Sequence, residues 1–164
     1  MSIYLDHAAA TPLDPRVVTA MMPYFSEAFY NPSSPYAPAV TVRRDYEAAK
    51  AKIAGVLGAQ AGELTMTAGA TESINLAFSG HTGHVVTTTI EHQAVLAAAT
   101  RYDHTLVAVD AHGRVDPAAI KDAIRPDTWL ISVGLANNEI GTVQPLVRIA
   151  EIMRGVRAER LEQG

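Results

Sequence analysis

The sequence contains no cysteine among its 164 residues. These residues therefore include no disulfide framework, no thiolate nucleophile and no cysteine-bound metal. Runs of lysine and arginine are also absent, and the net charge is −4 with an isoelectric point of about 5.8. Nucleic-acid binding needs clustered positive charge, so this composition argues against a nucleic acid as a direct partner.

Long apolar segments are missing as well. No segment approaches the roughly 20 apolar residues that cross a bilayer, and no basic segment followed by an apolar run opens the chain. We therefore expect neither membrane association nor a signal peptide, and we predict a cytoplasmic protein. The chain has 48% hydrophobic and 18% charged residues, which is typical of a globular domain long enough to form a core.

From residue 63 onward, strand patterns alternate with helix patterns. Strands are expected at 63–67, 84–90, 105–109 and 128–135, because these segments are short and rich in threonine or apolar residues. Helices are expected from residue 72, at 94–100, at 117–124 and from residue 145. This alternation predicts an α/β fold with a mainly parallel sheet flanked by helices.

Two helices are expected before residue 63. Asp14-Pro15 predicts the start of the first, since a capping side chain precedes proline at the first helical position. A proline-rich loop at 29–38 separates it from an amphipathic helix at 42–57, which Gly58 ends. The apolar residues expected on the buried faces are Val17, Val18, Met21, Met22, Tyr46, Ala49, Ile53 and Val56.

The turn at residues 68–71 is the first candidate binding feature. Ala68, Gly69, Ala70 and Thr71 have little side-chain bulk, so a ligand can approach the backbone closely. Unpaired N–H groups at a helix start favour a phosphate or carboxylate there, and the Thr71 hydroxyl adds a donor. A plain connection, with Thr71 or Ser73 as a helix cap, is the alternative.

Polar segments also follow two later strands, as Glu91-His92 and Asn137-Asn138. Ligands bind at the carboxyl ends of parallel strands, so we expect these segments to lie near residues 69–71. Simpler interpretations remain open. His92 also fits a local hydrogen bond at a helix start, and the asparagine pair also fits a turn.

A zinc site is the remaining possibility for the histidines at 81 and 84. Two further convincing ligands are missing, so no metal site is predicted. His81 and His84 also fit loop positions, and residues 102–104 are interpreted as a surface loop.

Five segments carry short motifs, at residues 4–12, 31–34, 69–77, 91–96 and 137–145. They include Asp6-His7-Ala8, Asn31-Pro32-Ser33-Ser34, Ala70-Thr71-Glu72-Ser73, Glu91-His92-Gln93 and Asn137-Asn138-Glu139-Ile140-Gly141. Together these resemble the cysteine desulfurases of the NifS/IscS type, which are pyridoxal 5'-phosphate (PLP) enzymes of the class V aminotransferase group. The resemblance implies the N-terminal part of a PLP-transferase large domain, of fold type I. Residues 36–40 depart from it, because a histidine and a glycine usually follow the Asn-Pro-x-Ser motif.

The resemblance also implies a role for individual residues. It implies that Gly69, Ala70 and Thr71 hold the phosphate of PLP. It implies that His92 is the catalytic residue and stacks on the pyridine ring, and that Asn138 hydrogen-bonds the ring hydroxyl oxygen or the substrate carboxylate. The residues implied near the substrate are Ala9, Ala10, Thr11, Asn31 and Asn138.

The implied reaction converts L-cysteine to L-alanine. An enzyme cysteine takes the sulfur as a persulfide, and a sulfur-acceptor protein passes it to iron–sulfur cluster assembly or tRNA thiolation. The alternatives are a non-catalytic module that binds phosphate or PLP, and another class V lyase such as selenocysteine lyase.

Several groups that this chemistry needs are absent from the 164 residues. The family's Schiff-base lysine and persulfide cysteine have no counterpart, since the lysines Lys50, Lys52 and Lys121 all fall on expected amphipathic helices. We therefore expect an N-terminal fragment that is inactive alone. Residues 1–12 would form an arm near the active site, and 13–164 an incomplete large domain without the small C-terminal domain. The expected partner is the missing C-terminal half or a second copy, with a homodimer when complete.

Overall fold

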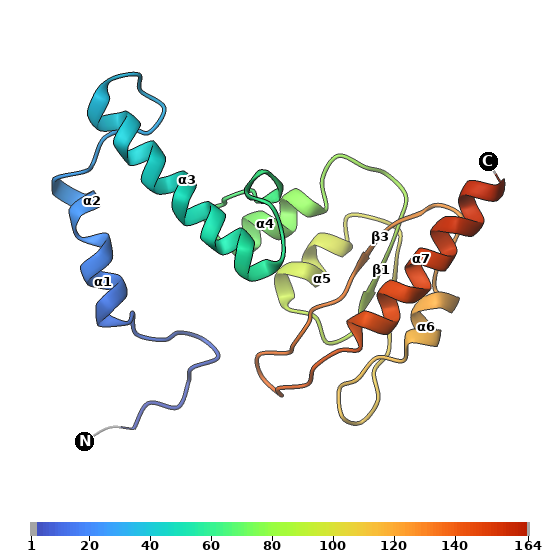
Figure 1. Cartoon of the computed structure of the whole chain (residues 1–164). Coiled ribbons are helices and arrows are strands. Elements are labelled where there is room, and N and C mark those ends of the chain that lie inside the picture. The colour runs from blue at the N-terminus through green and yellow to red at the C-terminus, as the bar shows by residue number, and fades with distance from the viewer. Residues whose placement is uncertain (1–2, 164) are drawn as a thin grey trace. The chain divides into compact units, whose positions relative to one another are not determined.

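A computed structural model describes residues 3–163 (Figure 1). The chain divides into two compact units, Met1–Met66 (unit 1) and Thr67–Gly164 (unit 2), which are described separately. Within the described residues, no helix combines the length and the apolar character that crossing a membrane requires. The boundary predicted at residue 12 between an arm and a large domain stays a prediction.

Unit 1 consists of helices and connecting loops over residues 3–66. Its helices are α1 (Pro15–Met21), α2 (Pro23–Ser26), α3 (Ala37–Leu57) and the short 3-10 helix η1 (Ala61–Glu63). The predicted start of α1 is confirmed, because the Asp14 carboxylate accepts from the backbone N–H of Arg16 at 2.8 Å. The predicted end of α3 is also confirmed, since Gly58 adopts a left-handed conformation with φ of 68°.

The buried faces predicted for the helices of unit 1 are wrong. Only Ala39 and Ala54 are buried among residues 3–66. The side chains predicted on these faces are all exposed, and that of Val56 reaches 88%. An apolar stripe is buried only by an element that packs against it, and among the described residues of unit 1 no element covers these stripes.

Two predicted boundaries in unit 1 also need correction. Helix α3 begins at Ala37 instead of residue 42, because Pro38 lies in the first turn, where a helix needs no N–H from it. The strand predicted at 63–67 is absent. Ala61–Glu63 forms η1 instead, in which the Glu63 carboxylate accepts from the N–H of Gln60 at 2.7 Å. The residues that follow have no strand to pair with among those described.

Unit 2 contains a three-stranded parallel sheet. Its strands are β1 (His84–Thr88), β2 (His104–Val107) and β3 (Thr128–Ser132), in the order β2-β1-β3. Val86 of β1 is opposite Thr105 on one side and Ile131 on the other. The helices between and around the strands are α4 (Ala70–Ala77), α5 (Gln93–Ala99), α6 (Pro117–Asp122) and α7 (Leu146–Gln163).

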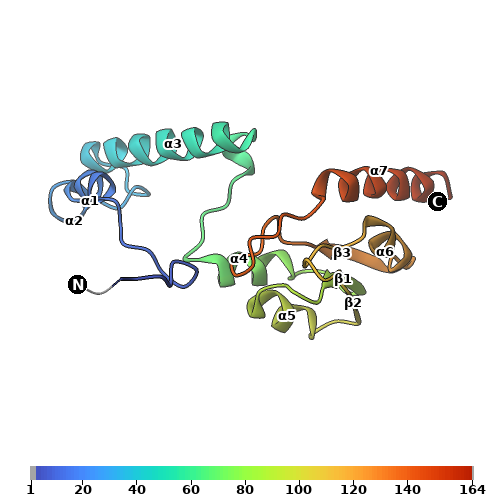
Figure 2. The same ribbon diagram turned by 90° about the horizontal axis from the view of Figure 1, so that it is seen from below.

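Helices cover both faces of this sheet (Figure 2). Successive side chains of a strand point to opposite faces, so Val85 and Val86 enter different clusters. Val85 packs with residues of α5 and with Phe78, which follows α4. Val86 packs with Ile120 of α6 and Ile149 of α7. The predicted α/β fold, with a parallel sheet between helices, is therefore confirmed for unit 2.

This topology fixes the positions of the candidate residues. Strand β1 is central and buried at every residue, so the turn that follows it is anchored to the core. The carboxyl ends of β1 and β3 are neighbours in the sheet, because both strands are parallel and paired. The segments that follow these strands therefore emerge side by side.

Candidate functional site

The first turn of α4 has free backbone donors. Its N-cap is Gly69, which has no side chain to cap the helix. Among the described residues, none accepts a hydrogen bond from the N–H groups of Gly69, Ala70 or Thr71. The Thr71 side chain is exposed. These donors suit a phosphate, because anions bind where N–H groups and the positive end of a helix dipole converge.

Neighbouring side chains stabilise the shape of this turn. The Glu72 carboxylate accepts from the N–H of Ala68 at 2.6 Å. The hydroxyls of Thr67 and Ser73 hydrogen-bond to each other at 2.7 Å, across the start of the helix. The alternative in which Ser73 caps the helix is therefore wrong, since its hydroxyl is paired with Thr67 and the N-cap is Gly69.

His92 is the N-cap of α5, at the end of the turn that follows β1. Its Nδ1 accepts from the backbone N–H of Ala94 at 3.1 Å. The local hydrogen bond that the sequence left open is therefore present. It also fixes the imidazole at the helix start, with Nε2 left for another group and the ring exposed.

The loop after β3 carries the asparagine pair. Asn137 forms a turn in which its Oδ1 accepts from the N–H groups of Glu139 at 2.9 Å and Ile140 at 3.1 Å. Its Nδ2 donates to the carbonyl of Ile90 at 3.1 Å. Asn138 is exposed beside it. The turn interpretation thus holds for Asn137, whose side chain is occupied, and leaves Asn138 available.

Two pockets lie where these segments meet, and both are lined by residues of unit 2. One, of about 210 Å³, lies between the turn after β1 and the loop after β3. The other, of about 380 Å³, lies against the same turn and loop. His92 and Asn138 line both pockets, whereas Thr71 lines neither. The structure therefore brings His92 and Asn138 together.

The remaining candidate residues belong to unit 1. Ala9, Ala10 and Thr11 lie on an exposed arm, in which the Tyr4 hydroxyl donates to the carbonyl of Ala10 at 3.0 Å. Asn31 forms a turn, since its Oδ1 accepts from the N–H of Ser33 at 2.9 Å. Their place beside a substrate stays a prediction.

Sequence reasoning assigned no role to several residues that build the 210 Å³ pocket. Glu91 and Gly134 both line this pocket, and Gly134 lies just after β3. Gln144 is buried, and its amide bonds the backbone of Gly113 and Val115. A signal for Glu91 and Gln144 is present in the sequence, because each is a polar residue next to an apolar strand or helix pattern.

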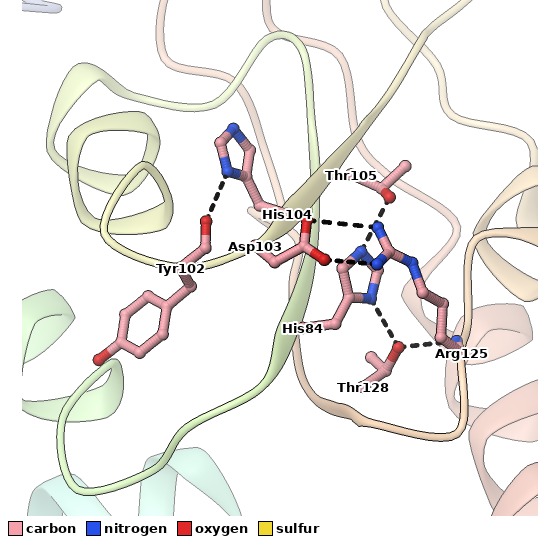
Figure 3. Close-up of polar contacts among 7 residues, drawn as sticks. All are labelled: His84, Tyr102, Asp103, His104, Thr105, Arg125 and Thr128. Carbon is pink, nitrogen blue, oxygen red and sulfur yellow. Dashed lines mark hydrogen bonds and ion pairs between the residues drawn. The ribbon is translucent and has the colours of Figure 1, made fainter.

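The opposite end of the sheet contains a buried polar cluster (Figure 3). His84 is fully buried in β1, with Nδ1 2.7 Å from the Thr128 hydroxyl and Nε2 2.8 Å from the Thr105 hydroxyl. Burial lowers the pKa of His84, and the positive charge of Arg125 lowers it further. The loop interpretation of His84 is therefore wrong, and its strand assignment is confirmed.

The surface-loop interpretation of residues 102–104 also needs correction. Tyr102 is half-buried against the core and its hydroxyl donates to the carbonyl of Phe78. His104 begins β2, and Asp103 pairs with Arg125 at 2.5 Å. Across the described residues, no group of three or more histidine and acidic side chains is arranged to hold a metal ion.

A family model described as "Aminotransferase class-V" matches residues 3–159. The chain belongs to the class V aminotransferase family. This confirms the resemblance seen in the motifs, and enzymes of this family generally use PLP. The fold is accordingly part of a PLP-transferase large domain.

Curated relatives of the chain are cysteine desulfurases. It is 42% identical over 168 residues to "Putative cysteine desulfurase IscS 1" of Bacillus subtilis (strain 168), which covers 95% of this chain and 44% of the relative. It is 41% identical to "Cysteine desulfurase IscS" of Methanosarcina thermophila, over 93% of this chain and 41% of the relative.

Solved structures agree with these relatives. A structure titled "SspA in complex with cysteine" matches 95% of this chain and 48% of its own, with a TM-score of 0.91 and 34% identity. A "NIFS-LIKE PROTEIN" matches 94% of this chain and 46% of its own, with a TM-score of 0.88 and 33% identity. The chain thus spans less than half the length of the proteins it matches.

Proposed function

We propose that this chain is the N-terminal, cofactor-binding part of a cysteine desulfurase, and that it is inactive without the remaining part. The observation that supports this most is the meeting of His92 and Asn138 at one pocket beside the carboxyl ends of β1 and β3. Parallel sheets bind ligands at that end. In a chain about 40% identical to cysteine desulfurases, the ligand to propose there is PLP.

The residues present suit the chemical groups of PLP. The free N–H groups of Gly69, Ala70 and Thr71, with the Thr71 hydroxyl, would bind its phosphate. The imidazole of His92 would stack on its ring, and Asn138 would hydrogen-bond the ring hydroxyl oxygen or the substrate carboxylate. When bound, PLP supplies an electron sink for the bonds of an amino-acid substrate.

The substrate proposed is L-cysteine. Ala9, Ala10, Thr11 and Asn31 would lie beside it, with small side chains that leave room and an amide that can bind a carboxylate. In the complete enzyme, L-cysteine and a cysteine thiol give L-alanine and a persulfide on that thiol. The sulfur then passes to an acceptor protein for iron–sulfur clusters or tRNA thiolation.

The groups missing from these residues must come from elsewhere. Lys50 and Lys52 lie on α3 and Lys121 on α6, so none follows a strand of the sheet. We infer that a longer polypeptide or a C-terminal chain supplies the lysine and the persulfide cysteine. A second copy of these 164 residues would bring no cysteine and could only cover exposed surface. In the part of the chain that the structure describes, β3 has a strand on one side only.

An apolar pocket next to β3 supports such a partner. It measures about 370 Å³ between β3, α6 and α7, and is lined by Trp129, Ile131, Met153 and Val156 together with α7 arginines. The indole N–H of Trp129 is buried without a hydrogen-bond partner among the described residues. Unpaired edges and buried donors are stabilised by a covering element.

A cytoplasmic location and the absence of direct nucleic-acid or membrane partners stay predictions.

A non-catalytic PLP-binding module is the second candidate. The lack of cysteine and of a lysine after any strand favours it for these 164 residues taken alone. Both candidates bind PLP, so catalysis by the completed protein separates them.

The test combines PLP binding with product analysis. The 164-residue chain and the complete protein from its native cells are incubated with L-cysteine, and L-alanine is measured by chromatography. We expect L-alanine only from the complete protein. L-alanine from the 164 residues alone would contradict the proposal, and its absence from both would favour the module.

Dialysis against PLP or pyridoxal tests the phosphate site. Thr71→Val should weaken PLP binding about tenfold, since it removes a hydrogen bond to a charged group, and should leave pyridoxal binding unchanged. Thr41→Val, an equivalent change at an exposed position of α3, is the control. Equal loss of PLP and pyridoxal binding would place the effect outside the phosphate site.

A further inference from the structure

The turn after β1 and the loop after β3 are joined through the side chain of Glu91. Its Oε1 accepts from the Thr88 hydroxyl at 2.8 Å, at the end of β1. The same oxygen accepts from the backbone N–H of Gly134 at 3.0 Å, just after β3. The Glu91 carboxylate therefore holds the two chain segments at a fixed separation.

The absence of a side chain at Gly134 makes room for this carboxylate. A Cβ at position 134 would lie 3.1 Å from Oε2 of Glu91. A contact this short is tighter than ordinary packing, so glycine is the residue that lets the carboxylate reach the backbone. The close approach of Glu91 to Gly134 thus depends both on the carboxylate and on the absence of a side chain at position 134.

Asn137 makes a second link between the same segments. Its Nδ2 donates to the carbonyl of Ile90 at 3.1 Å, while its Oδ1 accepts from Glu139 and Ile140 within its own loop. The amide oxygen therefore shapes the loop, and the amide nitrogen links the loop to the turn after β1.

Both links lie next to the residues proposed to contact PLP. Glu91 directly precedes His92, and Asn137 directly precedes Asn138. All of these line the 210 Å³ pocket. Site residues on exposed loops need support of this kind, because a small displacement is enough to weaken binding.

We propose that Glu91 and Asn137 are positioning residues, which set the separation of His92 and Asn138 across the cofactor pocket. This inference rests on the proposed function. Both side chains are only partly buried. We therefore expect them to contribute to the geometry of the pocket more than to the stability of the fold.

Four variants of the complete protein test this role. Glu91→Ala removes the acceptor, whereas Glu91→Gln keeps an oxygen that can accept both hydrogen bonds. Asn137→Asp keeps the acceptor of the loop turn, loses the donor to Ile90 and sets a carboxylate oxygen against that carbonyl. Glu47→Gln, at an exposed position of α3, is the control for loss of a carboxylate.

Three quantities are measured for each variant: the PLP dissociation constant, the visible circular dichroism of bound PLP, which reports ring orientation, and the unfolding midpoint of the apoprotein. Glu91→Ala should weaken binding about tenfold, the loss of hydrogen bonds to a charged group, and should change the dichroism. Glu91→Gln should restore both. Asn137→Asp should weaken binding by a smaller factor, with unfolding midpoints close to wild type throughout.

The outcomes separate this inference from the proposed function. If the wild-type protein does not bind PLP, the proposed function and the inference both fail. If it binds PLP and Glu91→Ala leaves affinity and dichroism unchanged, the inference alone fails. It also fails if Glu91→Ala or Asn137→Asp lowers the unfolding midpoint as much as a core substitution does, because the role is then structural.

Discussion

Units 1 and 2 bury their apolar residues to very different extents. In unit 2 the central strand β1 is buried at every residue, and two clusters of apolar side chains pack against its faces. In unit 1 only Ala39 and Ala54 are buried among residues 3–66. The two units are nevertheless similar in local regularity, since each contains capped helices of clear pattern.

The difference shows that helical pattern and core formation are separate requirements. Capping and spacing define α1 and α3 from local sequence. Burial of their apolar stripes needs a second element packed against them, and residues 3–66 supply none. Exposed stripes of this size on a folded protein mark contact surfaces. We infer that the stripes of α1 and α3 are covered in the complete protein.

The largest effect is expected from removing a phenylalanine side chain in each unit. Phe78 is 2% exposed in the core of unit 2, whereas Phe25 is 70% exposed in unit 1. Phe78→Ala should lower the free energy of unfolding by about 3–5 kcal/mol, through lost burial and a cavity. Phe25→Ala should change it by less than about 0.5 kcal/mol. Urea denaturation followed by circular dichroism measures both.

An equal cost for the two phenylalanines would break the comparison. It would mean that Phe25 is covered in solution by something that the burial within unit 1 does not include. Repeating the measurement at several protein concentrations would then identify a second copy, because its contribution grows with concentration.

Two glycines of positive φ provide a smaller contrast. Gly83, before β1, has φ of 122°, and a Cβ there would lie 2.6 Å from the carbonyl oxygen of Asp127. Gly58, after α3, has φ of 68° and free space around it. Gly83→Ala should cost about 2–4 kcal/mol, from strain plus a backbone clash. Gly58→Ala should cost about 1 kcal/mol, from strain alone.

Thermal and urea unfolding of both alanine variants would show this difference. If Gly58→Ala cost as much as Gly83→Ala, unit 1 would be packed around that turn as tightly as unit 2 is around β1. The same result would remove the distinction between a unit with a core and a unit without one.

The smallest effect expected is a pH dependence from the buried His84. Burial lowers its pKa, Arg125 and His104 lower it further, and Asp103 and Asp127 oppose this. An unfolded histidine takes up a proton near pH 6.5, whereas folded His84 does so only at lower pH. Its contribution to stability is therefore complete above about pH 6.5 and is lost as the pH falls below that value.

A comparison of wild type with His84→Gln measures this contribution. Between pH 7 and 5, the unfolding free energy of wild type should fall more steeply than that of the variant. The difference is at most about 1.4 kcal/mol per pH unit, the limit for one proton. If the unfolding free energies of wild type and variant changed in parallel with pH, water would reach His84 and its pKa would not be lowered by burial.

Sequence patterns were sufficient where the interactions are local or repeat along an element. The strands of unit 2 were placed within a few residues, and the N-cap Asp14 was confirmed. The helix expected from residue 145 was also placed correctly, since α7 begins at Leu146. In each case a cap, a proline or a periodic stripe decides the structure without distant contacts.

The errors arose where a distant partner decides the structure. The strand expected at 63–67 has no neighbour to pair with among the described residues, so its β-rich composition was not enough. His84 was uncertain because its partners Thr105 and Thr128 lie on other strands. The bond of Glu91 to Gly134 could not be predicted for the same reason, since it spans 43 positions.

The covalent state of PLP tests the central claim most directly. The complete protein is incubated with one equivalent of PLP, reduced with borohydride and dialysed. Its denatured intact mass and peptide map then show which lysine carries a pyridoxyl group. We predict one group on a longer species or on a second chain, and none within residues 1–164. A pyridoxyl group on Lys50, Lys52 or Lys121 at full occupancy would contradict the claim that these residues form only the phosphate- and ring-binding part of the site.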